Sequence, residues 1–262
     1  MAVHEATVAG VAERLYRAFA DGQRIAPVRH ELGGDPAAAY AVQQRNVGQW
    51  ERAGRRRAGA KAGLTLPALM ARMEAREPAC GVIFADSILG DGEAIPAARL
   101  FEPRLEVEVA FILGRDVTLE RPGVVDMIRA VDCVVPAIEV PQRRYAGDDL
   151  RAVDLIADNT AAGFVLVGTP ARPLAAVALD RCAAVLRCNG QEIARGEARN
   201  VYGNPMNALV FTARHMAARG LPLREGDLVM SGSLVPVHGC AIGDLVDAEI
   251  EGLGRVGGIV GG

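Results

Sequence analysis

Two glutamates occupy alternate positions of a segment that otherwise has the character of a β-strand. The segment is PRLEVEVAFILG, residues 103–114, and strand alternation places Glu106 and Glu108 on one face while the apolar residues between them form the other. Carboxylates two residues apart on a strand lie roughly 6–7 Å apart. At an effective dielectric near 20, their repulsion costs on the order of 2–3 kcal/mol. A solvated strand face tolerates such a pair without any function, whereas a nearby positive charge would turn the repulsion into attraction.

A third carboxylate, Glu139, lies within the apolar stretch DCVVPAIEVP. Acidic residues are seldom buried without a partner, and two acidic strands of this kind are explained together by one shared cation. Three carboxylates without nitrogen or sulfur ligands favour a hard ion, Mg²⁺ or Mn²⁺, with Ca²⁺ possible. Glu106, Glu108 and Glu139 are therefore candidate metal ligands.

Lysine use in this chain is unusual, because 28 of the 29 cationic residues are arginine and the other is Lys61. Arginine stays protonated in proteins, whereas a buried lysine can lose its proton. Lys61 is therefore a candidate proton-transfer residue, and burial beside a metal ion is expected to lower its pKa. The alternative is that one lysine codon survived by chance in an arginine-biased sequence.

The overall composition is that of an ordinary globular protein, with 262 residues, 50% hydrophobic and 23% charged. A net charge of −3 argues against nucleic acid or an anionic membrane as the main partner. The N-terminus lacks the basic start and apolar core of a signal peptide. The five cysteines show no CxxC spacing, so we expect reduced thiols in a cytoplasmic protein.

The order of patterns along the chain predicts an α+β fold with a β-rich core. Residues 5–21 have apolar positions at helical spacing, and Asp35 followed by Pro36 predicts the start of a second helix ending near residue 54. We therefore expect an N-terminal helical segment, 1–58, and a β-rich catalytic domain, 59–262, made of short strands between Gly, Pro and Asp. The glycine-rich end, GRVGGIVGG, is expected to fray.

Several motifs occur in an order that resembles a known family. They are AKAGLT, PRLEVEVAFILGRD, AVDCVVPAIEV, DLIADNTAAG, NGQEIARGEARNVYGNPMNAL, GDLVMSGSLV and GDLVDAEIEGLGRV. Together they resemble the 2-keto-4-pentenoate hydratase and 4-oxalocrotonate decarboxylase family of the fumarylacetoacetate hydrolase superfamily, over nearly the whole chain. The resemblance implies a cytoplasmic homo-oligomer with a β-rich core, working in the meta-cleavage breakdown of aromatic compounds.

The resemblance also implies a role for each residue that matches a family motif. The implied metal ligands are Glu106, Glu108 and Glu139, and the implied active-site lysine is Lys61. The residues whose motifs approach the substrate are Thr65, Asn159 and Ser233. A 2-hydroxydienoic or 2-oxo acid would bind the metal through its carboxylate and C2 oxygen, and Lys61 would move protons.

Two activities fit this resemblance. A hydratase would add water to 2-hydroxypenta-2,4-dienoate (2-oxopent-4-enoate) and form 4-hydroxy-2-oxopentanoate, whereas a decarboxylase would act on 4-oxalocrotonate (2-oxohex-3-enedioate). Family hydratases carry an aspartate where this chain has Ala79, in EPACG, which favours decarboxylation unless Asp86 or a water substitutes. A third possibility is a non-catalytic subunit that supports a paralogous hydratase or decarboxylase, but the retained glutamates and Lys61 argue against it. The motifs elsewhere fit either activity, and the hydratase is preferred only slightly.

Overall fold

The computed structural model describes residues 3–261, so the first two residues of the N-terminal segment and the last residue of the glycine-rich end lie outside it. The helices are α1 (Glu5–Asp21), α2 (Pro36–Arg52), α3 (Pro67–Arg72), α4 (Val124–Ala130), α5 (Ala152–Ala157) and α6 (Pro205–Ala218). The strands are β1 (Arg57–Gly63), β2 (Ala79–Phe84), β3 (Ile88–Gly90), β4 (Ala94–Ile95), β5 (Arg104–Leu113), β6 (Val131–Val140), β7 (Phe164–Val167), β8 (Ala183–Cys188), β9 (Gln191–Glu197), β10 (Leu228–Met230), β11 (His238–Gly239), β12 (Leu245–Ile250) and β13 (Gly254–Val260).

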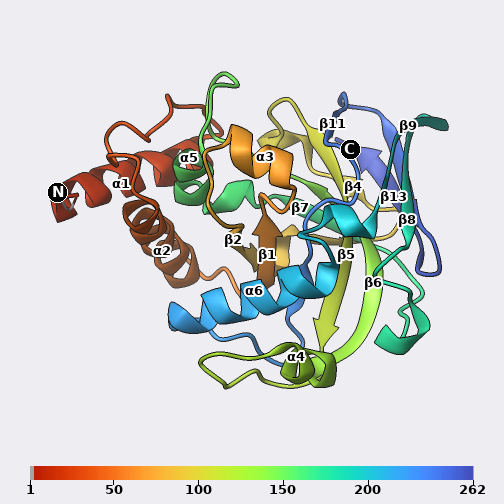
Figure 1. The fold of residues 1–262 in the computed structure, drawn as a ribbon. Coiled ribbons are helices and arrows are strands. Elements are labelled where there is room, and N and C mark those ends of the chain that lie inside the picture. The colour runs from red at the N-terminus through yellow and green to blue at the C-terminus, as the bar shows by residue number, and fades with distance from the viewer. Residues whose placement is uncertain (1–2, 262) are drawn as a thin grey trace.

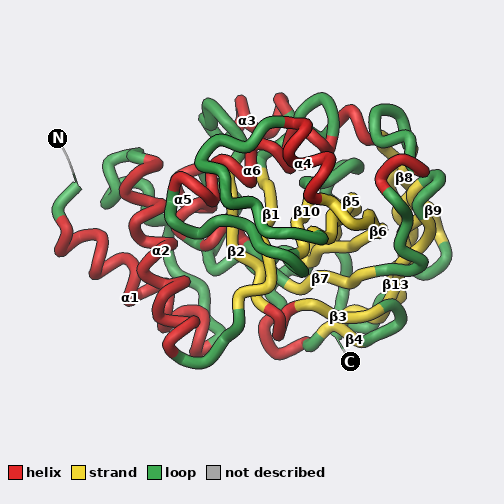
Figure 2. The backbone as a smooth tube through the Cα atoms, turned by 90° about the horizontal axis from the view of Figure 1, so that it is seen from below, coloured by secondary structure: helices red, strands yellow, loops and turns green. Residues whose placement is uncertain are grey.

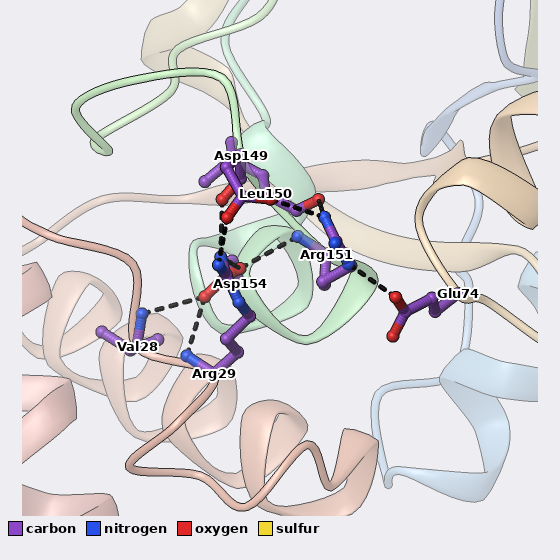
Figure 3. Close-up of polar contacts among 7 residues, drawn as sticks. All are labelled: Val28, Arg29, Glu74, Asp149, Leu150, Arg151 and Asp154. Atoms are coloured by element: carbon purple, nitrogen blue, oxygen red, sulfur yellow. Dashed lines mark hydrogen bonds and ion pairs between the residues drawn. The ribbon is translucent and has the colours of Figure 1, made fainter.

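The N-terminal helices pack together with α5 at one side of the molecule (Figure 1). The apolar stripe of α1 is buried, and α2 begins as the sequence predicts, with the Asp35 side chain accepting a hydrogen bond from the Ala37 amide. Between these helices, the amides of Val28 and Arg29 donate to Asp154 on α5 (Figure 3). The helical segment is thus attached to the rest of the chain by a buried carboxylate as well as by apolar contacts.

Two sheets make up the β-rich part of the molecule (Figure 2). The larger sheet has the order β2-β1-β10-β5-β6-β7-β3, with β11 paired to β5, and the smaller sheet has the order β4-β13-β12-β8-β9. β6 packs against β12 and β13, while α6 packs against β1, β2 and β10. The main hydrophobic core lies between these elements, and the alternate residues Leu105, Val107 and Val109 of β5 are fully buried in it.

The α+β fold class predicted from the sequence is confirmed, and the predicted strand at 103–114 is β5. The expectation that the glycine-rich end frays is wrong, because residues 254–260 form β13 between β12 and β4. Glycine is needed there for close packing: a Cβ on Gly258 would lie 2.5 Å from the carbonyl oxygen of Glu93. The boundary between 1–58 and 59–262 remains a prediction; β1 begins at Arg57. Within the described part of the chain, no helix has the length and apolar character required to cross a bilayer.

Candidate active site

The two acidic strands are direct neighbours in the larger sheet. β5 and β6 run antiparallel, with Glu106 opposite Glu139 and Glu108 opposite Ala137. Cross-strand partners have Cβ atoms about 4.5–5.5 Å apart, and the small side chain of Ala137 leaves room beside Glu108. As a result, one carboxylate oxygen from each of Glu106, Glu108 and Glu139 lies within 4.8 Å of the other two.

Lys61 lies on β1, and its ammonium group contacts this cluster at Glu139. Its Nζ lies 2.6 Å from Oε2 of Glu139, and both side chains are almost completely buried. The residue opposite Lys61 on β2 is Gly81, which has no side chain to compete for the space above the sheet. Three carboxylates therefore share one ammonium group, which leaves the cluster with surplus negative charge.

This surplus charge alters the proton affinity of every buried member of the cluster. Burial, reinforced by the neighbouring Glu139 and Glu106 charges, raises the pKa of Glu108 well above its usual range. Burial raises the pKa of Glu139 to about 7, although Lys61 acts in the opposite direction. Burial lowers the pKa of Lys61, but the charges of Glu139, Glu106 and Glu108 raise it by more, so without a metal ion it lies above its usual value. The predicted lowering by burial beside a metal ion stays a prediction.

Backbone amides donate hydrogen bonds to some of these carboxylate oxygens. The Gly232 amide donates to Oε2 of Glu108 at 2.7 Å, and the Gly163 amide donates to Oε1 of Glu139 at 3.3 Å. Oε1 of Glu108 is buried and has no hydrogen-bond partner among the described residues. A buried, unpaired carboxylate oxygen is costly, and a divalent cation would satisfy it. The donor set, three carboxylates with surplus negative charge, fits Mg²⁺, Mn²⁺ or Ca²⁺.

A cavity of about 510 Å³ opens onto the cluster. Lys61, Thr65, Glu106 and Ser233 line it, while Glu108 and Glu139 lie buried beneath. The Ser233 hydroxyl accepts from the Val107 amide and donates to the Val235 carbonyl, which fixes its position at the wall. Three of the predicted site residues from outside the acidic strands are thus brought to the same cavity.

Asn159 does not line this cavity. Its side chain is buried and both ends of its carboxamide bind the backbone of Val82, on the edge of β2. It is not among the described residues that line the cavity, although its neighbours Thr160 and Ala161 are. Asn159 is therefore close to the site without presenting a free polar group to it.

The two positions that bear on the choice of reaction are also outside the cavity lining. Ala79 is fully buried in the apolar cluster that includes the N-terminal helices. Asp86 forms an ion pair with Arg55, 2.7 Å away, and is half exposed, so it does not take the place of the missing aspartate.

Sequence reasoning assigned no role to Gly163, Gly232, Thr160 or Ala161, although each lies in a motif that the resemblance used. Their contribution comes through backbone amides and wall contacts between segments far apart in the chain, which one sequence does not reveal. A larger cavity, about 1030 Å³, lies between the start of α2 and α5. None of the predicted site residues is among the described residues that line it.

The chain is similar to known proteins both in sequence and in fold. Residues 54–260 match the family model described as fumarylacetoacetate (FAA) hydrolase C-terminal. The chain is 43% identical over 244 residues to 2-keto-4-pentenoate hydratase 1 of Dechloromonas aromatica, covering 92% of each chain. It is 38% identical to 2-keto-4-pentenoate hydratase of Burkholderia vietnamiensis, covering 95% of this chain and 96% of the relative.

Among solved structures, 4-oxalocrotonate decarboxylase from Pseudomonas putida G7, complexed with magnesium and adipate, superposes with a TM-score of 0.92. The identity is 26%, and the match covers 98% of each chain. The chain belongs to the fumarylacetoacetate hydrolase family, in the branch that holds the 2-keto-4-pentenoate hydratases and 4-oxalocrotonate decarboxylases.

Proposed function

We propose that this protein is a divalent-metal-dependent hydratase that converts 2-hydroxypenta-2,4-dienoate and water into 4-hydroxy-2-oxopentanoate. The observation that carries the proposal is the convergence of Glu106, Glu108 and Glu139 within 4.8 Å of one another, beside the buried Lys61 and under an open cavity. Seven relatives named as hydratases, at 36–43% identity, support the choice of reaction.

The three glutamates are proposed to hold Mg²⁺ or Mn²⁺, which when bound would supply a Lewis acid for the carboxylate and C2 oxygen of the substrate. Glu106 faces the cavity, so its carboxylate lies on the side from which substrate arrives. Glu108 and Glu139 are held from behind by the amides of Gly232 and Gly163. Such fixed donors keep the ligands in place before substrate binds.

Lys61 is proposed to move the proton that turns the dienol into a conjugated enone. Its ammonium group lies at the floor of the cavity and is held by Glu139, 2.6 Å away. Delivery of a proton to C5 of the dienol, with loss of the C2 hydroxyl proton, leaves a C3–C4 double bond conjugated with the C2 ketone. Water then adds at C4, with a proton to C3. Thr65 and Ser233 are proposed to contact the substrate from the cavity wall.

Decarboxylation of 4-oxalocrotonate is the second candidate, and two observations favour it. Ala79 is buried among apolar side chains and offers no proton-transfer group where family hydratases carry aspartate. Arg72, at the end of α3, lines the cavity and has no ion-pair partner among the described residues, so it is available to a second substrate carboxylate. A diacid therefore fits the charge of the cavity as well as a monoacid does.

The two candidates are separated by an ultraviolet assay with Mg²⁺ and purified protein. 2-Hydroxypenta-2,4-dienoate and 2-oxohex-3-enedioate are supplied separately, and products are identified by mass spectrometry. Loss of the dienoate with formation of 4-hydroxy-2-oxopentanoate is the expected result. CO₂ release from the diacid alone would overturn the hydratase assignment in favour of the decarboxylase. Inactivity on both would point to a substrate with a different tail or to the supporting-subunit alternative. Location in the cytoplasm, homo-oligomer formation and association with a paralogue stay predictions from the resemblance.

A further inference from the structure

Beside the acidic cluster, the backbone makes a turn that L-amino acids rarely adopt. Asn159, Thr160 and Ala161 have φ values of 52°, 53° and 52°, so three consecutive residues with side chains lie in the left-handed region. This conformation is sterically costly for residues other than glycine. It persists only where the surrounding structure holds it, and such sites concentrate near functional centres.

The edge of β2 holds this turn. β2 is the end strand of the larger sheet, so its outer backbone groups have no neighbouring strand among the described residues. The Asn159 carboxamide takes the place of one: its Nδ2 donates to the Val82 carbonyl at 2.9 Å, and its Oδ1 accepts from the Val82 amide at 2.8 Å. The Thr160 hydroxyl donates to the Cys80 carbonyl at 2.7 Å. Two adjacent side chains of the turn are thus fixed to one strand.

Two glycines allow the turn to lie directly on the sheet next to Lys61. A Cβ on Gly81, the partner of Lys61 across β1 and β2, would lie 2.4 Å from the Asn159 carbonyl oxygen. A Cβ on Gly63 would lie 2.6 Å from the Thr160 methyl carbon. Glycine at both positions brings the turn against the face from which the Lys61 side chain projects.

The other end of the turn contacts the end of β6, the strand that carries Glu139. The Ala161 carbonyl accepts from the Gln142 amide at 2.9 Å, just after β6. Two residues beyond the turn, the Gly163 amide donates to Oε1 of Glu139. On the preceding side, the buried Asp158 forms an ion pair with Arg144. The turn therefore contacts both β1, which carries Lys61, and the chain that directly follows β6, which carries Glu139.

We propose that the left-handed turn Asn159–Ala161 positions the Lys61–Glu139 pair, and that Asn159 is a positioning residue that fixes the turn to β2 without touching substrate. Loss of the carboxamide would remove two of the three side-chain hydrogen bonds that hold the turn on β2, and the Gly163 amide and the wall beside Lys61 would then shift together. The kinetic part of the test rests on the proposed function, whereas the metal-binding part does not.

The test uses Asn159→Gly, since glycine adopts the left-handed conformation freely and lacks only the carboxamide. Asn159→Asp is the second variant; it retains the acceptor for the Val82 amide but sets a carboxylate against the Val82 carbonyl. Asn189→Gly is the matched control. Asn189, in the turn between β8 and β9, is also left-handed, with φ 50°. Its carboxamide also makes two hydrogen bonds: it donates to Asp244 and accepts from the Leu245 amide.

Metal affinity is measured by calorimetric titration of Mn²⁺ into the metal-free full-length protein, and kcat and KM by the dienoate assay. We expect Asn159→Gly and Asn159→Asp to weaken Mn²⁺ binding about 10–100-fold, as found for residues that orient metal ligands. We expect kcat to fall by a similar factor, with KM changing by less than about threefold. Asn189→Gly should match the wild type in all three quantities.

Wild-type Mn²⁺ affinity and kcat in a folded Asn159→Gly protein would overturn the proposal. A rise in KM with unchanged kcat and unchanged Mn²⁺ affinity would also overturn it, because that pattern belongs to a substrate contact. If Asn159→Gly does not fold, Thr160→Val provides the same test: it removes only the bond to the Cys80 carbonyl, and the expected loss of metal affinity is a few-fold. Should the protein turn out to use another substrate, the Mn²⁺ titration still decides the matter.

Discussion

The carboxylates of Asp154 and Glu108 are both fully buried, but they differ in whether each oxygen has a hydrogen-bond partner. Asp154 is fully buried and accepts hydrogen bonds from the amides of Val28, Arg29 and Arg151 and from the Arg29 guanidinium (Figure 3). Glu108 is equally buried, but one of its oxygens has no partner among residues 3–261. A carboxylate whose oxygens are all bonded within the protein serves the fold, whereas a buried carboxylate with an unpaired oxygen, in a cluster of like charges, is a candidate ligand for a cation.

The carboxylates beside the N-terminal helices and the glutamate cluster also differ in how their negative charge is balanced. Asp158 has its own buried arginine, Arg144, whereas three glutamates share Lys61. The Asp158–Arg144 pair is therefore neutral, whereas the glutamate cluster has surplus negative charge, which a divalent cation would balance. Burial alone does not distinguish a structural carboxylate from a metal ligand. The donors and the net charge around it do.

The largest expected effect concerns Lys61. In a Lys61→Arg variant, positive charge remains beside Glu139 but the group can no longer give up its proton. We expect kcat on the dienoate to fall about 10²–10⁴-fold, the usual contribution of a general acid or base, while Mn²⁺ still binds. The steady-state assay and a Mn²⁺ titration measure the two quantities. Turnover at the wild-type rate would contradict the proton-transfer role.

Replacing Asp154 should lower the free energy of unfolding and leave the proposed metal site intact. Asp154→Ala leaves four donors among the described residues without their carboxylate. Breaking a buried, charged network of this kind costs about 3 kcal/mol in the free energy of unfolding. Urea denaturation of the metal-free protein measures the loss, and Mn²⁺ affinity of the folded fraction provides the control. If metal affinity fell while stability did not, the two groups would not be separate.

The glutamate cluster should make the metal-free protein less stable as pH rises. The pKa of Glu139 is raised to about 7 and that of Glu108 is raised well above its usual range, so between about pH 4.5 and 7 these two groups bind more protons in the folded state than in the unfolded state. Burial lowers the pKa of His215 to about 4, which acts in the opposite direction, but that is one group against two. Stability must then fall with pH across this window. Thermal unfolding in EDTA from pH 5 to 7.5 measures the slope.

Saturating Mg²⁺ provides the control for that slope, because a bound cation favours the ionised carboxylates. With Mg²⁺ present, the melting temperature should no longer fall between pH 5 and 7.5. The same slope with and without Mg²⁺ would mean that the cation binds elsewhere.

The smallest expected effect concerns the outer part of the Asp154 network. Glu74 lies 2.8 Å from the guanidinium of Arg151, but its side chain is 71% exposed (Figure 3). Exposed ion pairs contribute about 0–1 kcal/mol, so Glu74→Gln should change the free energy of unfolding by less than that. Urea denaturation again provides the measurement. A loss as large as that of Asp154→Ala would mean that exposure does not divide this network as we describe.

Much of the fold follows from local patterns in the sequence. Alternation along residues 104–113 predicts β5 and its buried face, and the Asp35–Pro36 pair predicts the start of α2. Register is different: nothing local in the chain places Glu106 opposite Glu139, which depends on how β5 and β6 meet. The left-handed turn at Asn159 is likewise beyond local rules, because contacts with β2 hold a conformation that its own residues disfavour.

For the site, residue types were more informative than spacing. The rarity of lysine draws attention to Lys61, and acidic residues inside apolar strands draw attention to Glu108 and Glu139. The positioning role proposed for Asn159 could not be predicted in the same way, because its carboxamide bonds to Val82 on β2, 77 positions away in the sequence. The glycines at 163 and 232 act through their amides, which carry no side-chain signal at all.

The central claim is that Glu106, Glu108 and Glu139 bind one divalent cation, and calorimetric titration of Mn²⁺ into metal-free protein tests it most directly. The account predicts one site per chain in the wild type, lost in Glu108→Gln and retained in Asp154→Asn. Equal Mn²⁺ binding by the wild type and Glu108→Gln would contradict it.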